Sequence, residues 1–334
     1  MSIRVGIIGA GDIARVHVRA IRAAGGNVVA VSALSERESK AFALEHDIEL
    51  AFEGAESLLE RVDAVVIATP NGEHAGQTIA SVRAGVPVLC EIPAGVSLNE
   101  AVAVKDEAER SGVTVMVAHT LRFLEPMQRL RDDIAKSRFT PRHVILRRTT
   151  MRRTNAGWSG QPRAWVDSIV WHHGAHQVDF ALWLLQGERA DLTKITVHGS
   201  VGSQRSIAGQ PLDLGAVLGV EDGGLVSLSL SYNSSRDVED ALIIGDERTY
   251  VFSNGQLRST SASERDSFSR HISPGVQRDV EGSPASRLDD LKKQAIRAQD
   301  AEFLRAISEG RQPRSSIKDI LPAMHVLQAL VQEG

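Results

Sequence analysis

The sequence lacks three features that would point to particular partners or locations. It has one cysteine, Cys90, in 334 residues, so no disulfide can form within the chain, and we expect a reducing, cytoplasmic environment. Its formal net charge of −4 provides no overall field that would attract nucleic acid. No apolar run approaches the roughly 20 residues that cross a bilayer, so we expect no membrane partner.

Internal repeats and low-complexity tracts are also absent. The apolar start of the chain is interrupted by Gly9, Gly11 and Asp12, so it is not expected to be a signal segment. The composition, 42% hydrophobic and 24% charged, is that of a globular protein, and the length suits two domains.

The first part of the chain alternates short apolar runs with amphipathic stretches. This alternation is typical of a parallel sheet covered by helices on both faces. We therefore predict an α/β fold that begins with a doubly wound Rossmann domain over residues 1–121. The apolar runs are 3–8, 27–34, 62–68, 86–90 and 113–118, and the helical stretches are 12–24, one ending near 46, 73–84 and 98–111.

Beyond residue 121 the pattern changes to strands with alternating polar residues. We predict an α+β domain over residues 122–334, with a mainly antiparallel sheet that serves substrate binding and oligomerisation. A segment rich in Ser, Arg and Asp, residues 259–287, is expected to be a loop. The predicted strands are 193–199, 214–220, 224–232, 242–245 and 250–253, and the helices are 126–136, 169–185, 291–309 and 317–333.

Two glycines separate the first predicted strand from the first helix, in a G-x-G-x-x-A pattern. Such glycines allow a tight turn and let a pyrophosphate approach the positive helix N-terminus. We expect Gly9, Gly11, Asp12 and Ile13 to contact a dinucleotide. The alternative, a glycine turn without a ligand, is weakened by the surrounding alternation of strands and helices.

The residues after the second strand favour NADP over NAD. An acidic residue about 20 positions beyond the glycines normally binds the ribose hydroxyls of NAD, but Ser35 stands there, followed by Arg37. A hydroxyl and a guanidinium suit a 2′-phosphate. Because Glu36 lies between them, NAD stays possible, and Arg37 could instead begin a solvated helix.

Two further segments, ATPNGEH at 68–74 and AGVPVLCEIP at 84–93, contain the ends of buried strands. Open parallel sheets bind ligands at this edge of the sheet. With the glycine motif, the two segments resemble the Gfo/Idh/MocA family of glucose-fructose oxidoreductases and inositol dehydrogenases. The resemblance implies a nicotinamide-dependent oxidoreductase with a cis Ile92–Pro93 bond. Ile92 stands where the family has a lysine that orients the substrate hydroxyl, so either other residues do this or the activity is lost. The expected cofactor contacts in these segments are Thr69, Pro70, Asn71, His74, Glu91 and Pro93.

Three histidines and an aspartate lie within residues 170–179. In one helix, His172, His176 and Asp179 would share a face beside an apolar stripe, and His173 would point away from both. The histidine pair also has zinc-ligand spacing, but no glutamate follows the first histidine and no cysteine is near, so no metal is expected. A second alternative is that these histidines only form internal hydrogen bonds at a helix end and have no catalytic role.

The chemistry favours a catalytic role for these histidines. Hydride transfer from a carbinol to a nicotinamide requires a base for the hydroxyl proton, and imidazole titrates near neutrality. The family resemblance implies the same, because members carry D-x-x-x-H here and His176 matches the histidine close to the reacting hydroxyl. His172 stands in the place of the aspartate. We expect both to be catalytic.

Five motifs resemble one branch of the family. They are E-I-P at 91, A-H-T-x-R-F at 118, R-R-x-x-M at 147, G-x-P-R-x-W at 160 and W-H-H-x-A-H-x-V-D at 171. That branch oxidises the cyclic hemiacetal of a carboxylated muconate semialdehyde to a pyrone dicarboxylate with NADP, in aromatic-acid degradation. The resemblance is dense before about residue 180 and thin from 190 to 290, and this chain is longer between Met151 and Pro162.

A carboxylated substrate calls for fixed guanidinium groups. Residues 122–163 hold 11 of the 38 basic residues, and ten of these are arginine. We expect Arg122 and Arg163, with His173 and Glu91, to contact the substrate. A solvated surface or an oligomer interface is the alternative, above all for Arg152 and Arg153.

Two other functions fit the sequence. A sugar or polyol dehydrogenase of the same family would lack the carboxylate contacts, and a catalytically inactive NADP(H)-binding sensor would explain the missing lysine. By analogy with the family we expect a homodimer or homotetramer.

Overall fold

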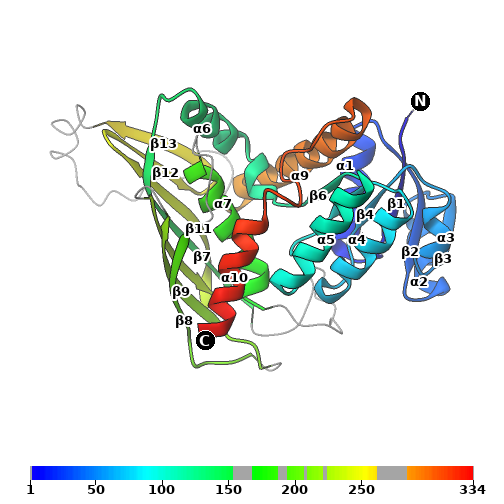
Figure 1. Cartoon of the computed structure of the whole chain (residues 1–334), viewed down its shortest axis with the longest axis horizontal. Coiled ribbons are helices and arrows are strands. Elements are labelled where there is room, and N and C mark those ends of the chain that lie inside the picture. The colour runs from blue at the N-terminus through cyan, green and yellow to red at the C-terminus, as the bar shows by residue number, and fades with distance from the viewer. Residues whose placement is uncertain are drawn as a thin grey trace.

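Two sheets form the framework of the molecule and lie side by side, with helices between them (Figure 1). The computed structural model describes residues 2–152, 168–186, 194–206, 209–220, 224–261 and 284–333. Within these ranges, no helix combines the length and apolar character that crossing a membrane requires.

Sheet A is the expected Rossmann sheet. Its six strands are parallel in the order β3-β2-β1-β4-β5-β6. The central strands are buried on both faces, which explains their uninterrupted apolar runs. Its strands are β1 (Arg4–Ile8), β2 (Asn27–Ala33), β3 (Leu50–Glu53), β4 (Ala64–Ile67), β5 (Val88–Cys90) and β6 (Val115–Val117). Its helices are α1 (Asp12–Ala23), α2 (Glu36–Glu45), α3 (Glu56–Leu59), η1 (Asn71–Glu73), α4 (His74–Arg83) and α5 (Leu98–Ser111).

Sheet B is the expected second sheet, with seven strands in the order β13-β12-β11-β7-β10-β9-β8. All neighbours are antiparallel except β7 and β10. In the described chain, helices cover one of its faces (Figure 1). The strands are β7 (Pro141–Met151), β8 (Ile195–Val201), β9 (Asp213–Val220), β10 (Gly224–Ser231), β11 (Asn233–Gly245), β12 (Arg248–Ser253) and β13 (Gln256–Ser261).

The central strand of sheet B is absent from the sequence predictions. Strand β7 contains four basic side chains, several of them at positions that are not buried. These polar residues interrupt the apolar pattern that would have predicted a strand. Strand β11 extends from residue 233, well before the predicted start at 242. Most of the predicted loop 259–287 lies outside the described residues, and its ends belong to β13 and to helix α9.

Helices of the second half of the chain connect the two sheets. Helix α9 packs against α1 of the Rossmann sheet, and α10 packs against both α5 and α7. The predicted helix at 317–333 begins only at residue 321, because Ser315 and Ile317 pair with strand β6 instead. The domain division at residue 121 stays a prediction. These helices are η2 (Thr120–Phe123), α6 (Glu125–Ala135), η3 (Val170–Gly174), α7 (Ala175–Gln186), α9 (Pro284–Glu309) and α10 (Leu321–Glu333).

Candidate active site

The two glycines after β1 have different surroundings. Gly9 has a φ of +111°, and a Cβ on it would lie 2.5 Å from the carbonyl oxygen of Ala68, so the fold itself requires glycine there. Gly11 is the N-cap of α1, supplies no side-chain cap, and a Cβ on it would meet no atom within 4 Å. The first turn of α1, at Asp12 and Ile13, therefore lies beside open space that fits a pyrophosphate.

The residues expected to choose the cofactor lie at the start of α2. Ser35 caps this helix by accepting a hydrogen bond from the backbone N–H of Glu38 at 3.3 Å. The Arg37 side chain is exposed in the first turn. Both stand past the end of β2, on the same sheet edge as the glycine turn.

His74 joins the two other segments expected at the cofactor. It is buried, and its ring nitrogens lie 2.8 Å from the carbonyl oxygens of Thr69 and Pro93. The side chain therefore connects the segments after β4 and β5, and its expected contact with the cofactor stays a prediction. The Ile92–Pro93 bond is cis, as the family resemblance implies.

Glu91 ends β5 and takes part in a buried chain of three charged groups. His17 of α1 lies between two carboxylates, with Nε2 2.9 Å from Oε1 of Glu91 and Nδ1 2.8 Å from Oδ2 of Asp300. The other oxygen of Glu91 accepts the backbone N–H of Ile92 at 3.1 Å. Burial lowers the pKa of His17, but the two carboxylates outweigh it and raise that pKa to about 10.

The histidine segment is not one continuous α-helix. Residues 170–174 form a π-helix, in which Gly174 donates to the carbonyl of Ile169 at 2.8 Å, and α7 follows. The wider turn brings the rings of His172 and His173 to 4.6 Å between centroids, so His173 does not point away as predicted. The apolar stripe is buried as expected, at Trp171, Ala175, Val178 and Leu182.

The neighbours of His172 indicate which ring nitrogen carries its proton. Its Nδ1 lies 2.7 Å from the hydroxyl of Tyr232 and 3.2 Å from Nη1 of Arg152. A guanidinium can only donate, so Nδ1 accepts and the proton of the neutral ring is on Nε2. His172 can therefore donate a hydrogen bond from Nε2.

His176 lies one helical turn further, with its ring centroid 6.2 Å from that of His172. Its Nδ1 is buried and has no hydrogen-bond partner among the described residues. Burial lowers the pKa of His176, and the Glu91 carboxylate is the foremost group opposing that shift. The ring is thus a neutral base near pH 7 with a carboxylate nearby that favours its protonated form.

Asp179 stands about one turn after His176 in α7 and acts electrostatically on that ring, and it also binds side chains outside this helix. Its carboxylate accepts from Nε of Arg122 at 2.8 Å and from Nη2 at 2.5 Å, and its Oδ2 lies 3.2 Å from Nδ1 of His119. The buried guanidinium of Arg122 is thus bound on one edge by an internal carboxylate, and its expected contact with substrate stays a prediction. Burial lowers the pKa of His119 to about 4, against the effect of Asp179.

Positive groups surround the histidines on the side of sheet B. Arg152 lies with its Cζ 5.7 Å from the ring centre of Tyr232. Arg148 and Arg152 both act, after burial and His172, to hold the pKa of His173 well below its usual range. Of the arginines, Arg163 lies outside the described residues, as does Arg153.

A cavity of about 430 Å³ opens between the two halves of the molecule. Asn71 and Val96 line it from the Rossmann side, and Trp171 and Arg205 from the other. His172 and His176 are not among its lining residues, although Trp171 is adjacent to His172 in sequence. In the described part of the chain, no group of three His, Cys, Asp or Glu side chains is arranged to hold a metal ion.

Three residues of this site were missed at the sequence level: His17, Asp300 and Tyr232. His17 had a usable signal, because it occupies the apolar stripe of α1 with Ala14 and Ile21, where a titratable side chain needs a buried partner. Asp300 and Tyr232 had none, since only tertiary packing brings them to the histidines.

Comparison with known proteins agrees with this geometry. Residues 3–119 match the model of an oxidoreductase family with an NAD-binding Rossmann fold (GFO_IDH_MocA), and residues 126–267 match that of bacterial oxidoreductase C-terminal domains. The 4-carboxy-2-hydroxymuconate-6-semialdehyde dehydrogenase of Sphingobium sp. is 30% identical over 331 residues, 98% of this chain and 97% of the relative. Inositol 2-dehydrogenase 1 of Saccharopolyspora erythraea is 31% identical over 217 residues, 62% and 61% of the two chains.

Among solved structures, an oxidoreductase from Agrobacterium radiobacter in complex with NAD+, L-tartaric acid and magnesium has the same fold. Its TM-score is 0.81 at 18% identity, covering 99% of this chain and 96% of that one. Full-length similarity to a named dehydrogenase, the two family models and the Rossmann architecture lead to one conclusion. The chain belongs to the Gfo/Idh/MocA oxidoreductase family and is an NAD(P)-dependent dehydrogenase.

Proposed function

We propose that this dehydrogenase uses NADP to oxidise the hydroxyl-bearing carbon of a carboxylated hemiacetal or alcohol, with His176 as the base. The observation that carries this proposal is the state of His176. Its ring is neutral, lies beside the hydrogen-bond donor His172 and near the Glu91 carboxylate, and its Nδ1 has no partner in the part of the chain that the structure describes. Such a ring can take up a proton when the reaction releases one.

In the proposed reaction the substrate loses one hydride and one proton. When bound, the nicotinamide supplies the acceptor for the hydride that leaves the carbon. His176 takes the hydroxyl proton, the carbon–oxygen double bond forms, and a cyclic hemiacetal becomes a lactone. His172 donates from Nε2 to a substrate oxygen and so performs part of the orienting role of the family lysine, which Ile92 cannot perform.

The Rossmann half would hold the cofactor through the open first turn of α1, where backbone N–H groups suit a pyrophosphate. Thr69, Pro70 and Asn71 would border the nicotinamide with Glu91 and Pro93, since they follow the adjacent strands β4 and β5. Ser35 and Arg37 would hold the 2′-phosphate. Replacing Arg37 with Ala should reduce the preference for NADP over NAD about tenfold or more, measured as the ratio of kcat/KM values.

The substrate carboxylate would be bound by Arg152. One nitrogen of this guanidinium lies 3.2 Å from Nδ1 of His172, and its Cζ lies 5.7 Å from the ring centre of Tyr232. Arg163 stays a predicted second contact, and His173 would line the pocket rather than bind directly, because burial keeps it neutral.

The direct test mixes the purified protein with NADP or NAD and three substrate groups: cyclic hemiacetals of carboxylated muconate semialdehydes, their uncarboxylated analogues, and inositols or pyranoses. We expect reduced-cofactor absorbance with the first group and NADP. Turnover of inositols alone would instead support a polyol dehydrogenase, which the similarity to inositol 2-dehydrogenase 1 favours.

We also propose a homodimer or homotetramer formed through the face of sheet B that no described helix covers. Val217, Leu225 and Val251 are exposed apolar side chains on sheet B strands. Light scattering coupled to gel filtration gives the molar mass, and a monomer of 36.1 kDa would rule the assembly out. The cytoplasmic location stays a prediction.

A further inference from the structure

The three charged groups Asp300, His17 and Glu91 form an arrangement that the proposed reaction leaves unused. They come from α9, α1 and the end of β5, and residues 17 and 300 are 283 positions apart. His17 and Asp300 have no exposed surface, and Glu91 has 16% of its side chain exposed. Buried charges are costly unless each has a partner, so this arrangement calls for a reason.

The hydrogen bonds define the charge state of the imidazole. Each ring nitrogen of His17 faces a carboxylate oxygen, at 2.8 Å and 2.9 Å. When both carboxyls are ionised they can only accept, so both nitrogens donate and the ring is an imidazolium. Burial opposes this charge, but the Asp300 and Glu91 carboxylates raise the pKa of the ring to about 10. Burial raises the pKa of Asp300, and the charge and hydrogen bond of His17 oppose that rise.

The same bonds fix the Glu91 carboxylate in position and charge. One oxygen accepts from His17 and the other from the backbone N–H of Ile92, so the side chain cannot rotate without losing a bond. Burial raises the pKa of Glu91, but its bond to the imidazolium outweighs this and holds that pKa below its usual value. Without His17, the carboxyl would be buried beside an isoleucine.

The charge of Glu91 matters at His176. His17 of α1, His176 of α7 and His74 of α4 lower the pKa of Glu91. The carboxylate also acts on Asp300, on His119 and on the thiol of Cys90. His176 in turn faces Glu91, Glu239, Lys292 and Asp179 in addition to burial, and Glu91 is foremost among these charged groups. A fixed anion there favours the imidazolium that His176 becomes when it takes the substrate proton.

We propose that His17 and Asp300 are positioning residues of this dehydrogenase: Asp300 holds the His17 imidazolium, which keeps Glu91 ionised and fixed near the base His176. This inference rests on the proposed role of His176. The cation beside Glu91 is His17 of α1, which Asp300 of α9 holds in place. Glu91 directly precedes Ile92, which stands where the family has a lysine.

The first test reads the charge of His17 without using activity. In the full-length protein labelled with 15N-histidine, and assigned with His17→Gln, both ring nitrogens of His17 should carry protons at pH 8. A neutral ring at that pH would overturn the proposal.

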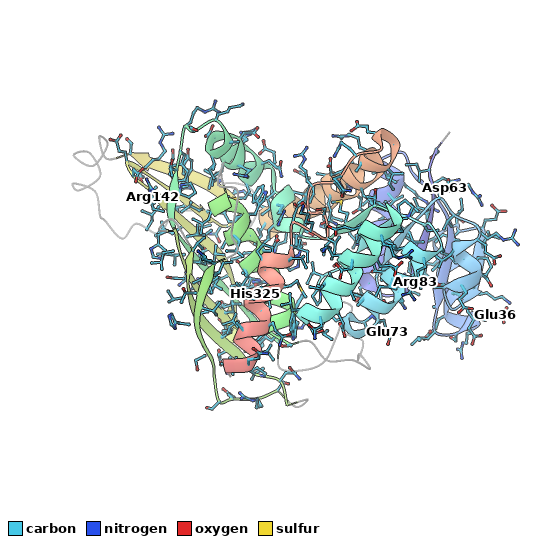
Figure 2. All side chains as sticks on the ribbon, viewed as in Figure 1. Glu36, Asp63, Glu73, Arg83, Arg142 and His325 are labelled. Carbon is cyan, nitrogen blue, oxygen red and sulfur yellow. The ribbon has the colours of Figure 1, made fainter. Side chains whose placement is uncertain are left out.

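The second test is the pH profile of kcat/KM. In His17→Gln, burial without a cation raises the pKa of Glu91, so the acid limb should move up by about one pH unit or more, with about tenfold lower activity at pH 6.5 and recovery by about pH 9. His325→Gln, at an exposed histidine of α10 (Figure 2), is the matched control and should keep the wild-type profile.

Two further variants keep the test decisive if His17→Gln is unstable. Asp300→Asn preserves shape, can still accept from Nδ1, and should shift the limb in the same direction by less. His17→Gln combined with Glu91→Gln removes the titrating carboxyl, so the raised limb should disappear while the maximal rate stays low. Wild-type profiles in His17→Gln and Asp300→Asn would refute the positioning role. If His176→Asn were fully active, the proposed function itself would fail.

Discussion

Arg122 and Asp179 form a bidentate ion pair inside the molecule, with nitrogen–oxygen distances of 2.8 Å and 2.5 Å between η2 and α7. Both side chains are almost fully buried. The pair joins the segment after the Rossmann sheet to α7, the helix that carries the proposed base His176, so it helps to position that helix.

Removing one partner of this pair should destabilise the protein strongly. Asp179→Ala leaves a buried guanidinium without its carboxylate, and we expect a loss of about 3–5 kcal/mol in the free energy of unfolding, measured by urea denaturation. The control is Arg142→Ala, whose pair with Asp246 is exposed, so its loss should leave the free energy of unfolding close to that of the wild type. An Asp179→Ala protein of wild-type stability would contradict the structural role given to this pair.

His176→Asn should lower kcat by about 10²–10⁴-fold, because the base for the hydroxyl proton is lost. The affinity for NADP, measured by fluorescence titration of the reduced cofactor, should stay within about twofold, since binding of the dinucleotide depends on the Rossmann half. Loss of cofactor binding together with activity would instead assign His176 a structural role.

The pH dependence of the wild-type enzyme follows from the lowered pKa of His176. A base is active when deprotonated, so kcat/KM should be level near pH 7 and fall as the pH drops through the pKa of His176, which burial lowers from its usual value. Stopped-flow rates from pH 5 to 9 measure this. An acid limb centred above pH 7 would be inconsistent with His176 as the base.

Gly9 and Gly11 should respond differently to the same substitution. Gly9→Ala places a Cβ against the carbonyl of Ala68 in a left-handed backbone, which we expect to cost about 1–3 kcal/mol or more in folding stability. Gly11→Ala meets no protein atom, so stability should change by less than about 0.5 kcal/mol while affinity for NADP falls. Thermal melting with and without NADP separates the two effects, and equal behaviour would argue against a pyrophosphate at Gly11.

Arg152→Ala should raise KM for a carboxylated substrate by about 10–100-fold and leave the uncarboxylated analogue little changed, because one charge-assisted hydrogen bond is lost. Arg147→Ala, in strand β7, is the control, because its side chain is 58% exposed and pairs with Asp240. If both variants raised KM equally, Arg152 would have no specific role.

Most of the Rossmann half could be predicted from the sequence, because local patterns specify it. Buried parallel strands need continuous apolar runs, and the turn at Gly9 needs a residue that tolerates positive φ. The second sheet was predicted in type but not in detail. Strand β7 was missed because its exposed arginines broke the apolar pattern, and the π turn at 170–174 was missed because helical periodicity assumes 3.6 residues per turn.

By itself, the sequence determined where ligand-binding backbone and candidate histidines lie along the chain, since spacing and periodicity are local properties. Tertiary structure alone decided which charged groups meet. The sequence did not show that the guanidinium of Arg122 pairs with Asp179, 57 residues away. Nor did it show that the imidazole of His17 lies beside Asp300 on a distant helix. Charge pairing depends on distance and burial in space, and neither is encoded in short-range spacing.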